Sequence, residues 1–239
     1  VAGGSYAEYV IVHHRTAAKI PDNLSFEQAA AVPEAYTTAY DAMVCQGNLS
    51  AGDCVLISAV GSGVGTAALQ IARAIGATSI GLSRTSEKIT RAIKLGLDFG
   101  IVVKDGDYCK KVLELTDGKG VDLVLELLGG DYVLQDLECV SNQGGIILVG
   151  LLAGAKVDFN LGQLLRKRIT IKGTTLRARP LEEKIEAGSL LAKRIASLLE
   201  TGRLYPVVDR IFSLWDVADA HRYMESNENF GKIILKIER

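Results

Sequence analysis

The amino-acid sequence predicts an α/β fold in which helices cover both faces of a doubly wound parallel sheet. Short runs rich in Val, Ile and Leu alternate with longer segments of helical character through the middle of the chain. These runs lack strict polar alternation, as expected for strands that are buried on both faces. A glycine-rich stretch at residues 58–65 directly follows the first run.

The expected elements can be placed along the chain. Strands of the parallel sheet are expected at residues 54–58, 78–82, 100–103, 121–126, 145–149 and 168–172. Helices are expected between them at residues 64–75, 86–95, 107–116 and 131–140. The C-terminal part predicts a helix, a strand, a helix and a strand, at residues 181–199, 208–213, 215–226 and 232–237.

The N-terminal part predicts a strand at residues 5–12, followed by a helix. Ser25 and Gln28 have the spacing of a capping box, which indicates where the helix starts. Pro33 interrupts this helix, which then continues to Val44.

Composition and charge restrict the function classes. The chain has 239 residues, 48% of them hydrophobic and 23% charged, with a formal net charge of −1. This balance gives no broad attraction to nucleic acid or to an anionic membrane. No apolar run reaches the roughly 20 residues that span a bilayer. The cysteines have wide, irregular spacings, which favour free thiols and a cytoplasmic location: Cys45, Cys54, Cys109 and Cys139.

The segment from Ser58 to Gly65 predicts a dinucleotide-binding loop of the Rossmann type. It matches the pattern AxxGxxG with Ser62 in the middle place, between Ala59 and Gly65. Small residues let the backbone approach a pyrophosphate, and the following helix offers free N–H groups and the positive end of its dipole. The alternative is a tight structural turn.

The residues after the second strand favour NADPH over NADH. NAD-preferring sites carry an acid at this position, on the ribose hydroxyls. Here the strand is followed by Ser83, Arg84 and Thr85, with Lys88 one turn further on. The two cations can pair with a 2′-phosphate, and the two hydroxyls can donate hydrogen bonds to it. The alternative is that Arg84 and Lys88 are solvated residues of a helix start.

Several strings resemble the zeta-crystallin-type quinone oxidoreductase branch of the medium-chain dehydrogenase/reductase superfamily. They are GSYAEYV at residues 4–10, AAVPEAYTTA at 30–39, GSGVGTAALQIAR at 61–73, KGVDLVLELLGG at 119–130, GGIILVGLLAG at 144–154 and NFGKIILKI at 229–237. They follow the family's order, and the likeness runs along the whole chain.

The resemblance implies a remnant of a GroES-like β domain at residues 1–33, an NADP-binding Rossmann domain at 34–200 and a return to the GroES-like domain at 201–239. It implies hydride transfer from NADPH to a small-molecule quinone or activated alkene (an enone). It also implies a homodimer that forms through the edge strand Ile169–Lys172. Family chains extend further at the N-terminus, so the resemblance implies that this chain is N-terminally truncated.

The resemblance also assigns the site residues. Thr38 would lie near the nicotinamide amide or the pyrophosphate, and Ser62, Gly63, Val64 and Gly65 would hold the pyrophosphate. Ser83, Arg84, Thr85 and Lys88 would surround the 2′-phosphate, and Leu128 and Gly129 the adenosine ribose. Gly150, Leu151, Leu152, Thr174, Thr175 and Leu176 would line the nicotinamide pocket. Asn229, Gly231 and Lys232 would close over the cofactor.

Two departures from the relatives bear on the chemistry. Val103 stands where family members often have a tyrosine on the adenosine side. The zinc-dependent relatives have a cysteine ligand where this chain reads Val32–Ala35, so no metal is expected. The cofactor supplies the hydride and water can supply the proton, so no catalytic residue is assigned.

Three functions therefore stay open from the sequence. The first is a zinc-independent NADPH:quinone or alkene reductase. The second is an enoyl-thioester reductase, which shares this scaffold. The third is a truncated cofactor-binding protein without turnover.

Overall fold

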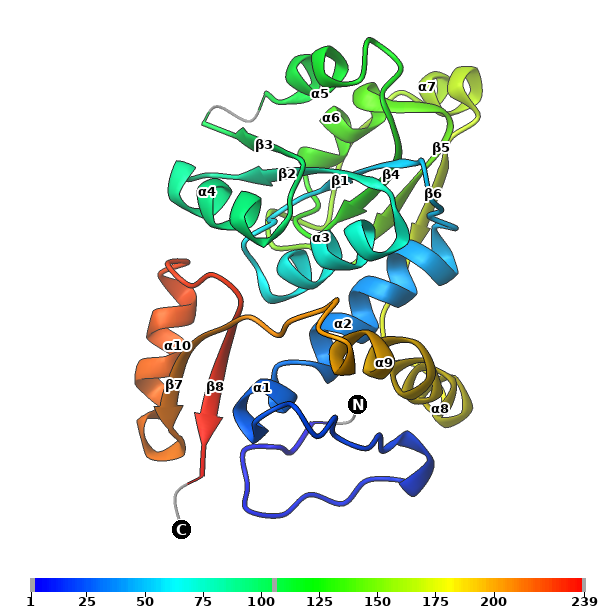
Figure 1. Ribbon diagram of the computed structural model, residues 1–239. Helices are drawn as coiled ribbons and strands as arrows, with labels where there is room; N and C mark the ends of the chain where they lie inside the picture. Colours follow the sequence, from blue (N-terminus) through cyan, green and yellow to red (C-terminus); the bar gives the residue numbers. More distant parts are fainter. Residues whose placement is uncertain (1–2, 105–106, 238–239) are drawn as a thin grey trace. The chain divides into compact units, whose positions relative to one another are not determined.

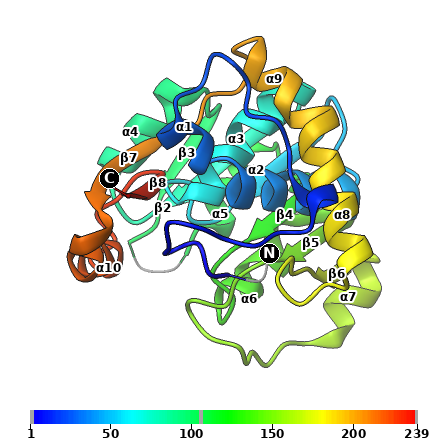
Figure 2. The same cartoon turned by 90° about the horizontal axis from the view of Figure 1, so that it is seen from below.

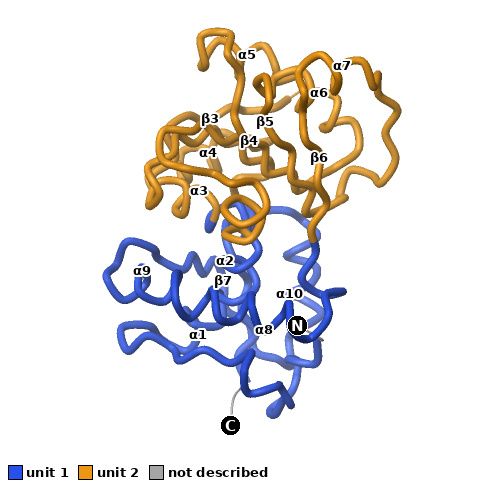
Figure 3. The backbone as a smooth tube through the Cα atoms, turned by 90° about the vertical axis from the view of Figure 1, so that its right-hand side faces the viewer, with its two compact units in different colours: residues 1–38, 62–67, 175–239 blue, residues 39–61, 68–174 orange. Residues whose placement is uncertain are grey.

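The computed structural model describes residues 3–104 and 107–237, which form two compact units (Figure 3). The first unit comprises residues 1–38, 62–67 and 175–239, and the second comprises residues 39–61 and 68–174. Unit 2 holds a six-stranded parallel sheet of order β3-β2-β1-β4-β5-β6 (Figure 1). The strands are β1 Cys54–Ile57, β2 Thr78–Ser83, β3 Phe99–Val102, β4 Val121–Glu126, β5 Val140–Leu148 and β6 Thr170–Gly173. The predicted parallel α/β fold is confirmed.

The strand order reverses between β1 and β4. In an open parallel sheet, ligands bind beyond the carboxyl ends of the strands at such a switch point. The residues that follow β1, β2, β4 and β5 are therefore the ones that matter for binding, and these are the segments that carry most of the predicted site residues in unit 2.

Helices connect the strands and cover both faces of the sheet. They are α3 Gly63–Ile75, α4 Ser86–Leu95, α5 Cys109–Leu115, α6 Tyr132–Cys139 and α7 Leu161–Lys167. Within unit 2, α4 and the later turns of α3 lie on one face, and α5 and α6 lie on the other (Figure 1). Helix α7 is absent from the sequence prediction. Its start is fixed by Asn160, whose side-chain oxygen accepts the Gly162 N–H at 2.8 Å.

The core of unit 2 lies between the sheet and these helices. Leu56, Ile80 and Val124 of the central strands are fully buried, and Leu137 of α6 packs against the same cluster. Continuous burial along β1 and β4 explains why these strands read as apolar runs in the sequence.

Unit 1 contains a second, smaller βαβ arrangement. Strands β7 Val208–Ser213 and β8 Lys232–Lys236 pair in parallel, and α10 Val217–Glu225 packs against them after a 3₁₀ turn at Leu214–Asp216 (Figure 2). The long C-terminal helix consists of α8 Leu181–Leu190, a π-helical stretch Leu191–Ile195 and α9 Ala196–Glu200.

The N-terminal helices begin as the sequence predicts. Ser25 and Gln28 form a reciprocal capping box at the start of α1 Phe26–Ala30. Helix α2 Pro33–Tyr40 starts at the proline and continues as a π-helix over Asp41–Gln46. The Glu27 carboxylate forms an ion pair with Lys236 at 2.9 Å. The hydrogen bond within this pair lowers the pKa of Glu27 to about 2.

The predicted strand at residues 5–12 is wrong. The described part of this segment is extended, but it pairs with no strand among the described residues, and Tyr9 and Ile11 are exposed. An apolar alternating segment forms a strand only where another strand accepts its main-chain hydrogen bonds.

His13 caps a 3₁₀ turn at His14–Thr16, and the rings of His13 and His14 stack with their centroids 4.9 Å apart. Across residues 3–104 and 107–237, no helix is long and apolar enough to cross a bilayer.

Two leucine truncations test where the core lies. Leu56 is completely buried on β1, whereas the Leu165 side chain on α7 is 79% exposed. We expect Leu56→Ala to lower the free energy of unfolding by about 2–5 kcal/mol, because it removes buried surface and leaves a cavity. Leu165→Ala is the matched control and should change it by less than about 0.5 kcal/mol. Urea unfolding measures both, and equal losses would contradict this core.

Candidate dinucleotide-binding site

The loop between β1 and α3 has the geometry of a phosphate-binding turn. Ala59 adopts a left-handed conformation with φ of 48°, which turns the chain sharply after the strand. Ser62 caps α3, since its hydroxyl oxygen accepts the Gly65 N–H at 3.0 Å. The N–H groups of Gly63 and Val64 lie in the first turn, where a helix has no carbonyl to receive them. These groups and the helix dipole suit an anion.

The C-terminal segment meets this helix start within unit 1. Ser62 forms a parallel β-bridge with Gly231, which has a φ of 98°. A Cβ on Gly63 would lie 2.3 Å from Cδ of Lys232, so only glycine lets the lysine stem cross at this distance. Asn229 donates its side-chain N–H to the Gly231 carbonyl at 3.1 Å. The structure thus brings Ser62 and Gly63 together with three residues from far along the chain, which are Asn229, Gly231 and Lys232.

At the end of β2 the predicted 2′-phosphate residues form the start of α4. The Thr85 hydroxyl oxygen accepts the Lys88 N–H at 3.4 Å, and the Ser83 hydroxyl oxygen accepts the Thr85 N–H at 3.3 Å. Arg84 is exposed between them, and Lys88 is partly buried. The next acid along the chain, Glu87, lies toward Arg91, with 4.0 Å between their charged atoms. The turn therefore presents two cations and hydroxyls, with no acid from Ser83 to Ser86.

The loops after β4 and β5 interlock within unit 2. Ala153 donates its N–H to the Leu128 carbonyl at 2.7 Å, and Gly130 donates to the Gly154 carbonyl at 2.9 Å. A Cβ on Gly150 would lie 2.3 Å from the Leu127 carbonyl oxygen. Because the two loops touch through main-chain atoms, they form one platform. Of the predicted ribose and nicotinamide residues, it contains Leu128, Gly129, Gly150, Leu151 and Leu152.

Two buried polar residues hold the loop after β4, and sequence reasoning missed both. Ser58 accepts the Leu127 N–H at 2.7 Å and donates its hydroxyl to the Leu125 carbonyl at 3.1 Å. Glu126 accepts the N–H groups of Leu128 and Gly129, the second at 2.8 Å. Burial raises the pKa of Glu126, and the two N–H groups oppose that shift. Glu126, the one acid in the otherwise apolar run LVLELLGG at residues 123–130, was the available signal.

The remaining predicted residues are distributed over both units. Thr38 is buried on α2, and Thr174 donates its hydroxyl to Asp41 at 3.2 Å. Leu151 and Leu152 are exposed in the loop after β5. Thr175 and Leu176 follow β6 and belong to unit 1. Val103, which stands where relatives often have a tyrosine on the adenosine side, is buried in the core.

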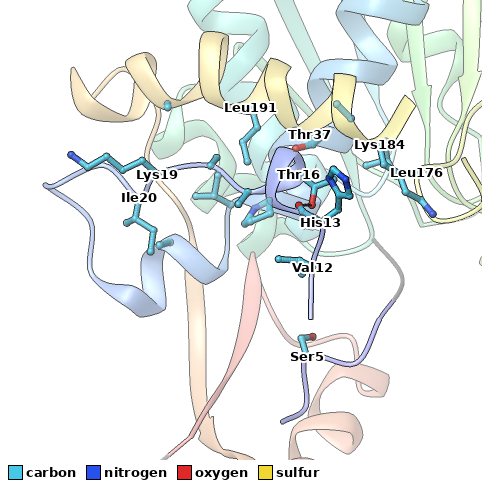
Figure 4. A pocket seen from close by; sticks show the side chains of 18 of the residues that line it. Ser5, Val12, His13, Thr16, Lys19, Ile20, Thr37, Leu176, Lys184 and Leu191 are labelled. Atoms are coloured by element: carbon cyan, nitrogen blue, oxygen red, sulfur yellow. Dashed lines mark hydrogen bonds between the residues drawn. The ribbon is translucent and has the colours of Figure 1, made fainter. Parts of the chain in front are cut away.

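Unit 1 encloses an apolar cavity of about 540 Å³. Its wall combines Val12 of the N-terminal segment with Leu191 and Leu199 of the C-terminal helix, and Leu176 lies at its edge (Figure 4). The ionisable side chains in its described lining are His13, Lys19 and Lys184. Such a lining suits an apolar group, and its described residues include no carboxyl side chain.

Comparison with known proteins shows the family. A family model described as zinc-binding dehydrogenase matches residues 63–193, which include the phosphate loop, α4 and the interlocked loops. Human quinone oxidoreductase is 32% identical over 97% of this chain. The chain belongs to the zinc-binding dehydrogenase family. As the sequence predicted, its relatives include quinone oxidoreductases of the medium-chain dehydrogenase/reductase superfamily.

Other family members differ in size and in the reactions that their names describe. The highly reducing polyketide synthase ZEA2 of Gibberella zeae is 33% identical over 97% of this chain. A solved structure of an NAD-dependent alcohol dehydrogenase has a TM-score of 0.87 and 33% identity, over 98% of this chain. The chain spans 69% of the human relative, 66% of the solved structure and 10% of the synthase. The family to which the chain belongs consists of nicotinamide-cofactor dehydrogenases and reductases.

The residues present do not fit a zinc ion. Within the described residues, 3–104 and 107–237, no group of three or more His, Cys, Asp and Glu side chains is placed to hold a metal. A protein zinc site needs three or four such ligands. The chemistry of this chain is therefore derived without a metal-bound step.

Glycine substitutions test whether the interlocked loops need their close approach. Gly150→Ala places a methyl group against the Leu127 carbonyl, and we expect a loss of about 1–3 kcal/mol in unfolding free energy. Gly173→Ala on β6 is the matched control, since no atom beyond its chain neighbours lies within 4 Å of the place that its methyl group would take. Chemical denaturation should separate the two variants, and a neutral Gly150→Ala would show that the loops are not packed in this way.

Proposed function

We propose that this protein is an NADPH-dependent, zinc-independent reductase that transfers a hydride to a quinone or another activated alkene. The observation that carries the cofactor choice is the turn after β2, where residues 83–86 offer Arg84 and hydroxyls but no acid, and Lys88 follows one turn further on. A 2′-phosphate needs cations there, whereas free ribose hydroxyls are matched by a carboxylate. The similarity to quinone oxidoreductases supports the acceptor class.

In this proposal each loop holds one part of the cofactor. The N–H groups of Gly63 and Val64 bind the pyrophosphate, with the charge of Lys232 beside them, while the Gly65 N–H is held by the Ser62 hydroxyl. The platform of the loops after β4 and β5 supports the ribose and nicotinamide. The predicted flanking residues, Thr38, Thr174, Thr175, Leu176 and Asn229, complete the assignment. We propose that residues 1–33 and 201–239 belong to a GroES-like domain.

The bound cofactor supplies the hydride. The chain's own residues bind the phosphates, orient the rings and exclude water from the site of transfer. A quinone or enone accepts the hydride without covalent attachment to the protein, and its proton can come from water. This is consistent with a site that has hydrogen-bonded main chain, cations and apolar side chains, and no assigned acid–base pair.

A second candidate is an enoyl-thioester reductase. The 33% identity to a highly reducing polyketide synthase favours it, because such a synthase acts on thioester-bound chains and this chain matches one-tenth of its length. Both candidates use the same cofactor and differ in the acceptor. The third possibility, a cofactor-binding protein without turnover, shares the NADPH site.

The assembly and location are also proposals. Strand β6 is an edge strand of the described sheet, and pairing with a second copy would satisfy its outward main-chain groups. We propose a homodimer formed in this way, and a cytoplasmic enzyme.

Charge substitutions test the cofactor preference. We expect Arg84→Ala and Lys88→Ala each to weaken NADPH binding by about 1.5–3 kcal/mol, because each removes a charge-assisted hydrogen bond to the 2′-phosphate. NADH binding should not change. Lys94→Ala, which removes an exposed cation from the last turn of the same helix, is the matched control. Fluorescence titration with both nucleotides measures the affinities. Equal losses for NADH and NADPH would contradict this assignment.

Acceptor assays separate the candidate reactions. NADPH oxidation by the unmodified chain is followed with 1,4-naphthoquinone and with crotonyl-CoA. Faster turnover of the quinone supports the leading proposal, and faster turnover of the thioester supports the enoyl reductase. Saturable NADPH binding with neither activity would leave the cofactor-binding protein as the function.

A further inference from the structure

Two acidic side chains are buried together beneath the loop after β4. Glu126 ends β4 and Asp136 lies on α6, and both are completely inaccessible to solvent. In the part of the chain that the structure describes, Glu126 Oε2 and Asp136 Oδ2 have no hydrogen-bond donor. Buried polar atoms are almost always paired, so these two oxygens need an explanation.

The other oxygen of each carboxyl group is well occupied. Glu126 Oε1 accepts the N–H groups of Leu128 and Gly129. Asp136 Oδ1 accepts the hydroxyl of Tyr108 at 2.7 Å. The two main-chain N–H groups are the stronger compensation for a negative charge, since they are fixed by the fold and converge on one oxygen.

The two carboxyl groups act on each other as hydrogen-bond partners, an interaction that raises the pKa of Asp136 and works to lower that of Glu126. Two ionised carboxylates cannot form such a bond, because neither carries a donor. One proton held between them supplies the missing donor. Burial and the charge of Glu126 raise the pKa of Asp136 well above the ordinary range of an aspartate. The other ionisable groups that face the pair are the Tyr108 hydroxyl and the Cys139 thiol, both neutral near pH 7.

We propose that Glu126 and Asp136 share one proton, with Asp136 as the acid and Glu126 as the carboxylate, and that this pair is the positioning device for the ribose loop Leu127–Gly130. Glu126 holds the loop through two N–H groups, and Asp136 holds Glu126. The loop in turn fixes the nicotinamide loop through the Leu128 and Gly154 carbonyls. The link to cofactor binding rests on the proposed function, whereas the shared proton and the held loop do not.

Infrared spectroscopy of the unliganded protein tests the shared proton. Wild type should show the C=O stretching band of a protonated carboxylic acid near neutral pH. Asp136→Asn should abolish this band, because an amide N–H then replaces the shared proton and Glu126 stays ionised. A wild-type spectrum without the band, or a band that survives Asp136→Asn, would overturn the pair.

Amide exchange and NADPH affinity test the positioning role. Asp136→Asn keeps a donor toward Glu126, so exchange at Leu128 and Gly129 and the Kd for NADPH should match wild type. Asp136→Leu removes the donor, and we expect faster exchange at both amides and about tenfold weaker NADPH binding or more. Val124→Ala, a truncation at a buried site on β4 that leaves the pair intact, is the control for general destabilisation and should leave both readouts unchanged.

The outcomes separate this inference from the cofactor proposal. If wild type binds no NADPH but the amides respond as described, the proposed function is wrong and the positioning pair stands. If NADPH binds to wild type and the Asp136→Leu amides exchange normally, the positioning role is wrong. If Asp136→Asn and Asp136→Leu raise amide exchange and the Kd for NADPH equally, the charge of Asp136 matters and its proton does not. If Asp136→Leu does not fold, the Asp136→Asn rescue and the infrared band still decide the proposal.

The pH dependence of stability gives an independent check. The folded pair keeps a proton that the unfolded chain releases above the ordinary aspartate pKa of about 4. The contribution of this proton to the free energy of unfolding is therefore fully present at low pH, and it is lost as the pH rises toward the raised pKa of the folded pair. Thermal unfolding should show the Tm of wild type falling relative to Asp136→Asn between about pH 5 and pH 8. A constant difference across this range would contradict a retained proton.

Discussion

The carboxyl-end junction of β1 and β4 depends on hydrogen bonds to two buried polar side chains. At the point where the strand order reverses, the chain must leave the sheet in loops whose main-chain groups no longer belong to a ladder. Ser58 and Glu126 accept the N–H groups of the first three residues beyond β4. These bonds hold the glycine-rich loop after β4 in place at the carboxyl end of the sheet.

The same strand-to-loop geometry places the charged groups of the candidate site. The central strands are largely apolar, so an ionic ligand would be bound by the loops at their ends, where helices start and cations lie nearby. Gly63 and Lys232 approach so closely that a side chain on the glycine would collide with the lysine stem. The cations after β2 stand apart from this cluster in the sequence and match a second phosphate. In the proposed function, these two separate groups of cations fit a cofactor that carries both a pyrophosphate and a 2′-phosphate. The cofactor itself then supplies the hydride.

Much of this arrangement could be predicted from the sequence because its signals are local. Apolar runs predicted the six strands, and the capping box predicted the start of α1. The change from a strand pattern to a helix pattern predicted the start of α4, which Thr85 caps. The phosphate loop was recognisable from small residues between a strand and a helix. The motif did not reveal that Ser62 caps α3 with its hydroxyl, which requires the actual turn geometry.

The parts that could not be predicted depend on contacts between distant residues. The segment at residues 5–12 has the alternation of a strand, but strand formation needs a partner, and the described chain provides none. Glu126 and Asp136 are ten positions apart and belong to different elements, so their pairing appears only in the folded chain. Helix α7 was missed because it is only seven residues long, so the i, i+3, i+4 spacing of Leu161, Leu164 and Leu165 does not repeat over further turns.

The most direct measurement of the central claim is an NMR titration of the isotopically labelled chain with NADPH. The account predicts saturable shifts of the Gly63, Val64 and Gly65 amides together with those of Arg84 and Thr85, at a single dissociation constant. The Leu128 and Gly129 amides should shift in the same titration. Saturable binding that leaves the Gly63–Gly65 amides unmoved, or no binding at all, would contradict it.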